Sequence, residues 1–310
     1  MITALLAGAM TPTLLHRMVS AGGSGGLAPA DADRGGASPS FALAAAMRSR
    51  LATAAKAGPV ALIDVGADKI ACAAVTVDGR GAPAREATGG PRGEGPPVDD
   101  PLARLRMLGL GVVRSDGVEN GAITDLSAVG KAIRAAANQA EREAGVRLYA
   151  TVARLTGEQP SSHPLGGEVA LPRQKVSAKD MAAAISACHP PPLEEGRRVL
   201  DVAPVRWTVD GEPNIRAPLG FAGRRLGVDL HVLTVSESAV RNLAQCLASA
   251  DLEVSGLVSG PLASGLGCLA AEERDDGAAV VDLGHGATAV GLFVRGAFVF
   301  ADVIRLGGAQ

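Results

Sequence analysis

The sequence predicts an α/β protein with two related halves, a small α+β subdomain inserted in the first half, and an incomplete second half. Three observations lead to this fold class. Short apolar runs of strand type alternate with amphipathic helical segments. One strand–turn–strand motif occurs twice, and a basic, proline-rich segment interrupts the chain between the two copies.

The repeated motif spans 60–69 and 279–288. In each copy an apolar run ends in Asp-apolar-Gly, small residues follow, and a second apolar run begins, which is the pattern of a β-hairpin. One copy alone is more often an ordinary turn at a strand end. The spacing of 282 − 64 = 218 residues leaves room for a whole domain between the copies. The pair therefore indicates the duplicated layout of the actin-like (ribonuclease H-like) ATPases.

The turns of these hairpins carry residue types that suit phosphate and metal. Glycines let the turn backbone approach a ligand, and successive N–H groups can form a nest for phosphate oxygens. Asp64 and Asp282 end the two first strands, where a carboxylate can hold a hydrated Mg²⁺. Two such hairpins facing each other would clamp a nucleoside triphosphate from both sides.

Bulk composition excludes several function classes. The 310 residues suggest one large or two ordinary domains, with 47% hydrophobic residues to build a core. A net charge of −2 gives no reason to expect a nucleic-acid partner. The four cysteines are scattered and match no disulfide or metal pattern, as in a cytoplasmic protein. No apolar stretch approaches the ~20 residues of a membrane helix, and the apolar run at 2–10 lacks the positive region of a signal peptide.

The first half is expected to begin at 58 and to run to 155, a part that the resemblance described below identifies as subdomain 1A. Residues 1–57 are predicted to be a disordered leader, with Met47 as an alternative start, because 21–46 contain small and polar residues without periodicity. The Gly- and Pro-rich stretch 81–101, after a turn at Asp78-Gly79, is predicted to be a mobile loop.

Within this half a strand is expected at 105–113 and another at 146–153. Between them lies a predicted helix that Thr124 or Asp125 caps and Gly145 ends. One face of that helix is apolar and comprises Leu126, Val129, Ile133, Ala136, Ala140 and Ala144.

Segment 156–229 reads as the inserted α+β subdomain. It contains one short predicted helix, 179–188, with a capping box of Ser177 and Asp180, followed by strands at 198–204 and 205–210. The chain returns to the first half over 230–276. There we expect a strand at 231–235, a helix from a Thr234–Glu237 capping box to Ala250, and a helix at 262–273. The second hairpin opens the second half, subdomain 2A, at 277–310.

The order of these parts resembles one family closely, the bacterial cell-division protein FtsA. The match covers 58–310, whereas actin-like relatives such as heat-shock chaperones or sugar kinases share only the hairpins. The matching stretches are Asp64-Val65-Gly66 with Lys69, Gly109-Leu110-Gly111, Gly117, Gly121-Ala122-Ile123-Thr124-Asp125-Leu126, Ala140-Glu141-Arg142-Glu143-Ala144-Gly145, His231-Val232-Leu233-Thr234, Asn242-Leu243, Gly260-Pro261-Leu262-Ala263-Ser264, Val281-Asp282-Leu283-Gly284 and Val303-Ile304-Arg305-Leu306-Gly307-Gly308.

This resemblance implies an actin-like scaffold of the Z ring in which 156–229 is the family's subdomain 1C. It implies FtsZ, other divisome proteins and self-association as partners. The family is cytoplasmic and peripheral on the inner membrane at the division site. ATP and Mg²⁺ are the implied cofactors, weakly bound here, and the chain is expected to be at most a weak ATPase, without a catalytic residue to nominate.

The resemblance also assigns the residues of the nucleotide site. The implied nucleotide-binding residues are Asp64, Gly66, Ala67 and Lys69 in the first loop, Asp282, Gly284, Gly286 and Thr288 in the second, and Gly307 and Gly308 beyond it. Asp64 and Asp282 would hold Mg²⁺ through water.

Four positions depart from the family pattern. Ala67 replaces a hydroxyl residue, His285 a glycine, Ala287 a threonine and Ala289 an aspartate. Each lost hydrogen bond to phosphate is worth ~1.5–3 kcal/mol. A positive φ at His285 would cost roughly 1 kcal/mol more. Two interpretations of the His285 side chain stay open, a loop residue that faces solvent and a catalytic residue. We therefore expect a weakened nucleotide site.

The resemblance further predicts a C-terminally truncated chain. The family continues through an adenosine-binding segment, an FtsZ-binding subdomain and an amphipathic membrane helix, so membrane contact is not expected of the chain as given. Two other functions stay open. An acetate- or sugar-kinase-like phosphotransferase would need a catalytic carboxylate that the sequence does not identify, and a pilus-assembly actin homologue would share the hairpins.

Overall fold

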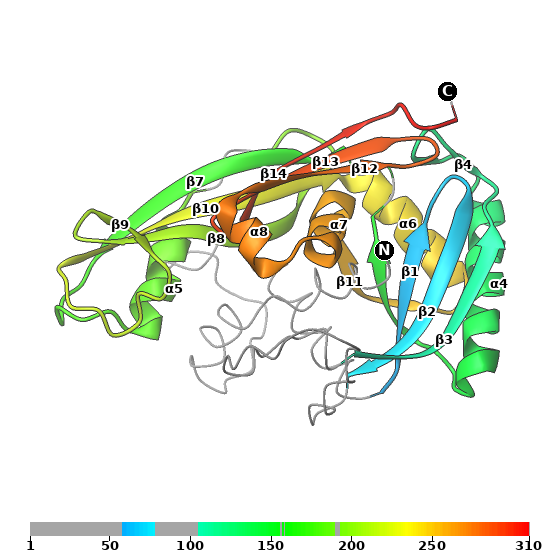
Figure 1. Ribbon diagram of the computed structural model, residues 1–310, viewed down its shortest axis with the longest axis horizontal. Coiled ribbons are helices and arrows are strands. Elements are labelled where there is room, and N and C mark those ends of the chain that lie inside the picture. Colours follow the sequence, from blue (N-terminus) through cyan, green and yellow to red (C-terminus); the bar gives the residue numbers. More distant parts are fainter. Residues whose placement is uncertain (1–57, 78–104, 156, 158, 190–192, 310) are drawn as a thin grey trace, which may run out of the picture.

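The computed structural model describes residues 58–77, 105–155, 157, 159–189 and 193–309 (Figure 1). The predicted leader 1–57, the predicted loop 81–101 and the predicted turn at 78–79 lie outside the described residues. Element labels follow Figure 1, in which the first described helix is α4.

The main sheet has five strands in the order β11-β6-β1-β2-β3. These are β1 (Val60–Val65), β2 (Lys69–Val77), β3 (Leu105–Arg114), β6 (Ala150–Arg154) and β11 (Glu253–Val258). β1 pairs antiparallel with β2 and parallel with β6, which in turn pairs parallel with β11. All six residues of β1 are buried, as expected for a strand covered on both faces. The carboxyl ends of β1, β6 and β11 therefore meet at one edge of the sheet.

Helix α4 (Leu126–Ala144) packs across this sheet and confirms the predicted helix together with its two ends. The Asp125 carboxylate accepts a hydrogen bond from the Ala128 N–H at 2.9 Å, and Gly145 ends the helix with a φ of 68°. The helix lies very close to β3, since a Cβ at Gly111 would be 1.9 Å from the Ala136 carbonyl oxygen. A two-stranded ribbon of β4 (Val118–Glu119) and β5 (Ala122–Ile123) precedes the helix.

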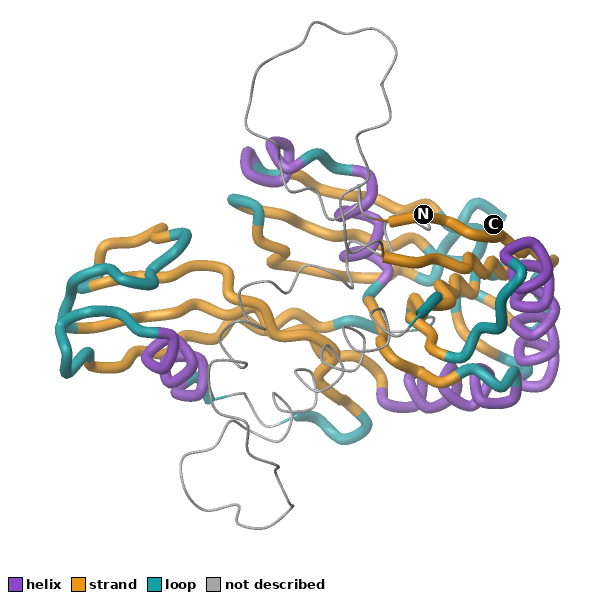
Figure 2. Tube along the Cα trace, turned by 90° about the horizontal axis from the view of Figure 1, so that it is seen from below, coloured by secondary structure: helices purple, strands orange, loops and turns teal. Residues whose placement is uncertain are grey.

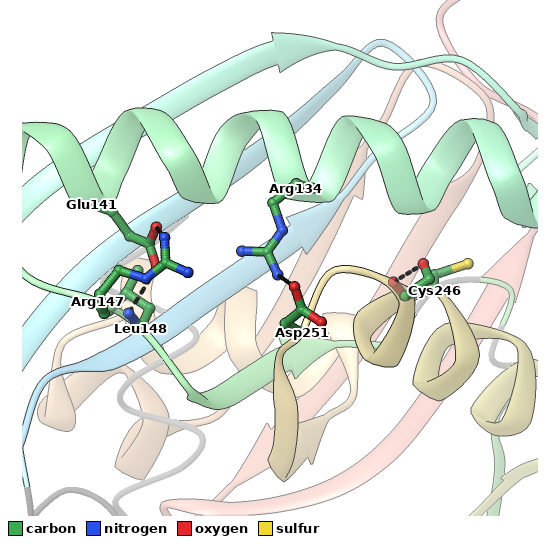
Figure 3. Close-up of polar contacts among 7 residues, drawn as sticks. Arg134, Glu141, Arg147, Leu148, Cys246 and Asp251 are labelled. Atoms are coloured by element: carbon green, nitrogen blue, oxygen red, sulfur yellow. Dashed lines mark hydrogen bonds and ion pairs between the residues drawn. The ribbon is translucent and has the colours of Figure 1, made fainter.

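The buried Glu141 explains why the following strand starts later than predicted. Its carboxylate accepts hydrogen bonds from the Leu148 N–H at 2.8 Å and from Arg147 Nη1 at 3.2 Å (Figure 3). The Val146 N–H bonds to the Glu141 carbonyl as part of the helix end. These residues are therefore held against α4, and β6 begins only at Ala150 rather than at 146.

A second sheet, in the order β7-β10-β8-β9, extends away from the main sheet (Figures 1 and 2). Its strands are β7 (Ser161–Ala170), β8 (Arg197–Val209), β9 (Glu212–Ile215) and β10 (Arg225–Ser236). Helix α5 (Ala178–Ala187) lies against it and encloses a separate core that includes Met181, Trp207 and Leu226. The predicted capping box of Ser177 and Asp180 is present.

Three predictions about this region need correction. The two strands expected at 198–204 and 205–210 form one strand, β8, with a bulge where Val205 is left out of the register between Pro204 and Arg206. The strand expected at 231–235 is only the second half of a longer strand, because β10 begins at Arg225 and continues to Ser236. Helix α6 (Glu237–Ser249) is capped by Ser236 and not by Thr234. The Ser236 hydroxyl accepts a hydrogen bond from the Ala239 N–H, whereas the Thr234 hydroxyl accepts one from Arg197 Nη2.

The C-terminal part contains α7 (Gly260–Cys268), α8 (Ala271–Asp276) and a sheet of three antiparallel strands, β12 (Ala278–Leu283), β13 (Thr288–Val294) and β14 (Ala297–Ile304). The single helix predicted at 262–273 is wrong. Leu269 and Ala270 are extended, and the Glu273 carboxylate accepts a hydrogen bond from the Ala270 N–H at 2.8 Å, which starts a new helix.

This C-terminal sheet packs on the rest of the chain (Figures 1 and 2). Phe293, Phe298 and Ala301 are buried in the main hydrophobic core, and the Ala301 N–H donates to Ser162 Oγ at 3.0 Å. The second hairpin therefore shares a hydrophobic core with the first half. Of the helices in the described residues, none has the length and apolar content needed to cross a bilayer.

Candidate functional site

The two hairpins have the same geometry. In the first, the Gly66 N–H donates to the Lys69 carbonyl at 3.0 Å, and in the second the Gly284 N–H donates to the Ala287 carbonyl at 2.9 Å. The strand registers also agree, since Asp64 pairs with Ala71 and Asp282 with Ala289. Each of these positions is shifted by the same 218 residues (69 + 218 = 287 and 71 + 218 = 289). The repeated sequence motif is thus a repeated structure.

Both hairpins need glycine for close backbone approach and not for a left-handed backbone. A Cβ at Gly66 would lie 3.0 Å from the Lys69 carbonyl oxygen, and one at Gly284 would lie 2.8 Å from that of Ala287. His285 is not among the described residues with positive φ, and its side chain is exposed. The strain considered for His285 is therefore absent, and its side chain faces solvent.

Arg154 joins the two hairpins. Ile63 pairs with Ala153 across the parallel strands β1 and β6. The next residue of each strand, Asp64 in β1 and Arg154 in β6, therefore lies at the same edge of the sheet. Arg154 Nη1 lies 3.3 Å from Asp64 Oδ1, and Nη2 lies 3.4 Å from Asp282 Oδ2. Asp64 is 2% exposed and Arg154 22% exposed. One guanidinium thus bridges a carboxylate from each copy of the motif.

Helix α7 completes this contact. Ser264 Oγ donates to Asp282 Oδ2 at 2.9 Å, which fixes the second carboxylate on the helix. One turn earlier, Gly260 lies directly beside Arg154, since a Cβ there would be 2.6 Å from the guanidinium Nε. The absence of a side chain at Gly260 therefore leaves room for the Arg154 guanidinium between the two aspartates.

The remaining first-loop residues divide into buried and exposed ones. Ala67 is half-buried and packs against the main core, and Lys69 is exposed. In the second loop, Thr288 Oγ1 donates to the Leu306 carbonyl at 2.7 Å. The nucleotide-binding role of these residues stays a prediction.

The backbone of the second loop contacts two other segments of the chain. The Gly308 N–H donates to the Gly284 carbonyl at 2.9 Å, so Gly308 and the adjacent Gly307 lie against the loop. Gly286 is buried against the turn between β4 and β5, where a Cβ would be 3.2 Å from the Asn120 nitrogen. The predicted site residues of the second loop therefore lie together, and Gly286 among them is buried against protein backbone.

The arrangement does not accommodate Mg²⁺ between the two aspartates while Arg154 stays in place. Both carboxylates already bond a cation, and a second cation between them would face the guanidinium at short range. Among the described residues no group of three or more His, Cys, Asp or Glu side chains could hold a metal ion.

Sequence reasoning missed Arg154 and gave Ser264 no role. A signal for Arg154 was present, because a single arginine ends the otherwise uncharged strand 150–153 in a parallel layout. Carboxyl ends of parallel strands meet at one sheet edge, so this arginine had to lie near Asp64. Its distance of 128 residues from Asp282 hid the second contact.

Comparisons with known proteins agree with this architecture. The family described as the SHS2 domain inserted in FtsA matches residues 157–234. "Cell division protein FtsA" of Rhizobium meliloti (strain 1021) is 34% identical over 249 residues, which cover 80% of this chain and 54% of that protein. The protein of the same name from Agrobacterium fabrum (strain C58 / ATCC 33970) is 33% identical over the same coverage. The chain thus spans about half the length of the curated relatives it matches.

Among solved structures, the PilM-PilN type IV pilus biogenesis complex is similar with a TM-score of 0.49 at 19% identity, covering 80% of this chain and 61% of that chain. The curated matches named here are cell-division proteins, which favours the predicted scaffold over the phosphotransferase and pilus alternatives. Over the residues that it shares with these relatives, the chain belongs to the FtsA family.

Proposed function

We propose that this chain acts in bacterial cell division as an actin-like scaffold, and that its role is to bind other proteins and not to turn over a substrate. The observation that carries the proposal is the SHS2 match at 157–234 within a chain that aligns with FtsA on both sides of it. For the whole protein, the proposed partners are FtsZ and other divisome proteins, together with further copies of itself. The proposed location of the whole protein is the cytoplasmic face of the membrane at the division site.

We propose the domain division that the sequence suggests. Residues 58–155 and 230–276 would form subdomain 1A, 156–229 subdomain 1C, and 277–310 the start of subdomain 2A. The separate hydrophobic core under α5 supports an independent unit in the insert.

The tip of the second sheet supports a binding role for this unit. Leu219 and Phe221 are 62% and 48% exposed, and the exposed Arg216 and Arg224 are close to them in sequence. Exposed apolar side chains beside arginine are typical of protein-binding surfaces. We propose that this tip contacts a divisome protein.

We also propose that the paired hairpins bind ATP weakly. The two copies of the loop lie together through Arg154, as a nucleotide clamp requires. Ala67 and Ala287 offer no hydroxyl to a phosphate, and each missing hydrogen bond would lower the binding free energy by ~1.5–3 kcal/mol. Any Mg²⁺ would have to enter with the nucleotide and outside the Asp64–Asp282 gap.

A fluorescent fusion of the protein encoded by the complete gene, expressed in its host, tests the division role. We expect enrichment at the septum and co-purification of FtsZ or another division protein. The double substitution Leu219→Ser/Phe221→Ser should abolish the co-purification of the protein that binds the tip. Met107→Ser, which also removes an exposed apolar side chain but on β3, serves as the matched control. Uniform cytoplasmic fluorescence without any bound division protein would contradict the proposal.

A further inference from the structure

Arg154 holds together two carboxylates that come from the two copies of the hairpin. The guanidinium reaches Asp64 with one terminal nitrogen and Asp282 with the other, at 3.3 and 3.4 Å. The proposed ATP binding uses the closeness of the two hairpins but gives the charge of Arg154 no role of its own. It is nevertheless the charged link between the hairpin that starts the first half and the hairpin that starts the second.

The surroundings of Arg154 are built to keep it there. Asp64 is buried, and burying a charge is costly unless an opposite charge lies beside it. Gly260 leaves the space that the guanidinium fills, since a Cβ would lie 2.6 Å from Nε and 2.8 Å from Nη2. Ser264 holds Asp282 at the other end of the link.

A divalent metal between two phosphate-loop aspartates would neutralise the same two charges. A guanidinium and a metal ion cannot both occupy the gap, because they carry charge of the same sign and would compete for the same oxygens. We propose that Arg154 is the resident cation of this site: it clasps the ends of β1 and β12 and takes the place that a divalent metal would have between Asp64 and Asp282. This inference goes beyond the proposed function and holds without any nucleotide.

The contact of Arg154 with Asp64 and Asp282 is called the clasp below. Thermal unfolding of the 310-residue chain, without nucleotide, tests it. The wild-type chain should show no saturable rise in Tm with MgCl₂ beyond that given by NaCl at equal ionic strength. Arg154→Met removes the charge and leaves two aspartates facing each other, so its Tm should fall by roughly 5–10 °C. Mg²⁺ should then restore part of that loss in a saturable manner, because ligand binding to the folded state raises Tm.

Three further variants separate the clasp from general destabilisation. Arg154→Lys keeps a cation and should stay insensitive to Mg²⁺. Arg134→Met breaks the 2.8 Å ion pair between Arg134 on α4 and Asp251 after α6 (Figure 3). The Tm of this variant should also stay insensitive to Mg²⁺. Adding Asp282→Asn to Arg154→Met should abolish the Mg²⁺ response, since only one carboxylate is left.

Two results would overturn the inference. One is a saturable Mg²⁺ stabilisation of the wild-type chain, and the other is a folded Arg154→Met variant that does not respond to Mg²⁺. Should Arg154→Met not fold, Gly260→Ala replaces it, because the added methyl displaces the flexible guanidinium and keeps both carboxylates. That variant should gain a Mg²⁺ response, and its failure to do so would equally reject the clasp.

Discussion

His231, a buried side chain on β10, makes the stability of the chain depend on pH. Its ring contacts Phe298 edge-on with centroids 5.5 Å apart, and its Nε2 atom has no hydrogen-bond partner among the described residues. Burial, with a smaller contribution from the nearby His163, lowers the pKa of His231 to about 4. The folded chain therefore keeps this histidine neutral where the unfolded chain, with a pKa of about 6.5, already binds a proton.

The sign follows from that difference. The contribution of neutral His231 to the free energy of unfolding is complete above about pH 6.5 and is lost as the pH falls toward 4. About 2 kcal/mol of the free energy of unfolding is lost between pH 7 and pH 5. Denaturant unfolding at both pH values measures it. His231→Leu should lose about that much of the pH dependence, whereas His189→Leu, at an exposed histidine, should keep it. Equal pH slopes in all three chains would show that His231 is not the group responsible.

At the scale of single elements, the stability of helix α4 depends on its N-cap residue, Asp125. The Asp125 carboxylate satisfies the Ala128 N–H at the start of the helix, where no backbone partner exists. Asp125→Ala should lower the free energy of unfolding by about 1 kcal/mol. Asp116→Ala removes the same charge from an exposed position nearby and should change stability by less than half as much. Chemical denaturation compares the two, and equal losses would argue against a capping role.

How well each element could be predicted depends on how local its causes are. α4 has a long apolar period, a capping carboxylate and a terminal glycine in its own sequence, so its range was predictable. α7 and α8 were merged because the apolar Leu269-Ala270 continues a helical pattern, while the break depends on the contact of Ala270 with Glu273. β8 was divided because the bulge at Val205 interrupts its alternation, although the partner strand keeps it whole.

The candidate site likewise has one part that the local sequence predicts and one part that depends on the tertiary fold. The turn geometry of both hairpins follows from a local motif, and the shift of 218 residues predicted their equivalence. The clasp does not follow from any local pattern, because Arg154, Asp282 and Ser264 come from three elements that only the tertiary fold brings together.

At the scale of the whole molecule, Phe293 fixes the C-terminal sheet on helix α7. It is buried, and a Cβ at Gly265 would lie 2.1 Å from its ring, so the ring rests directly on the helix backbone. Phe293→Ala should lower the free energy of unfolding by about 3–5 kcal/mol and expose the β13–β14 turn. Trypsin should then cut after Arg295 much faster than in the wild type. Phe300→Ala, on the partly exposed side of the same sheet, is the control, and equal cleavage rates would refute this role of Phe293.

We infer that the two hairpins form one nucleotide site that lacks phosphate-binding hydroxyls. Isothermal titration calorimetry of the complete chain with Mg-ATP tests this most directly. We expect a Kd on the order of 0.1 mM or weaker, because two missing hydrogen bonds reduce affinity by about two or more powers of ten. A micromolar Kd that is lost in Asp64→Ala would contradict the account, since it would show a fully working nucleotide cleft.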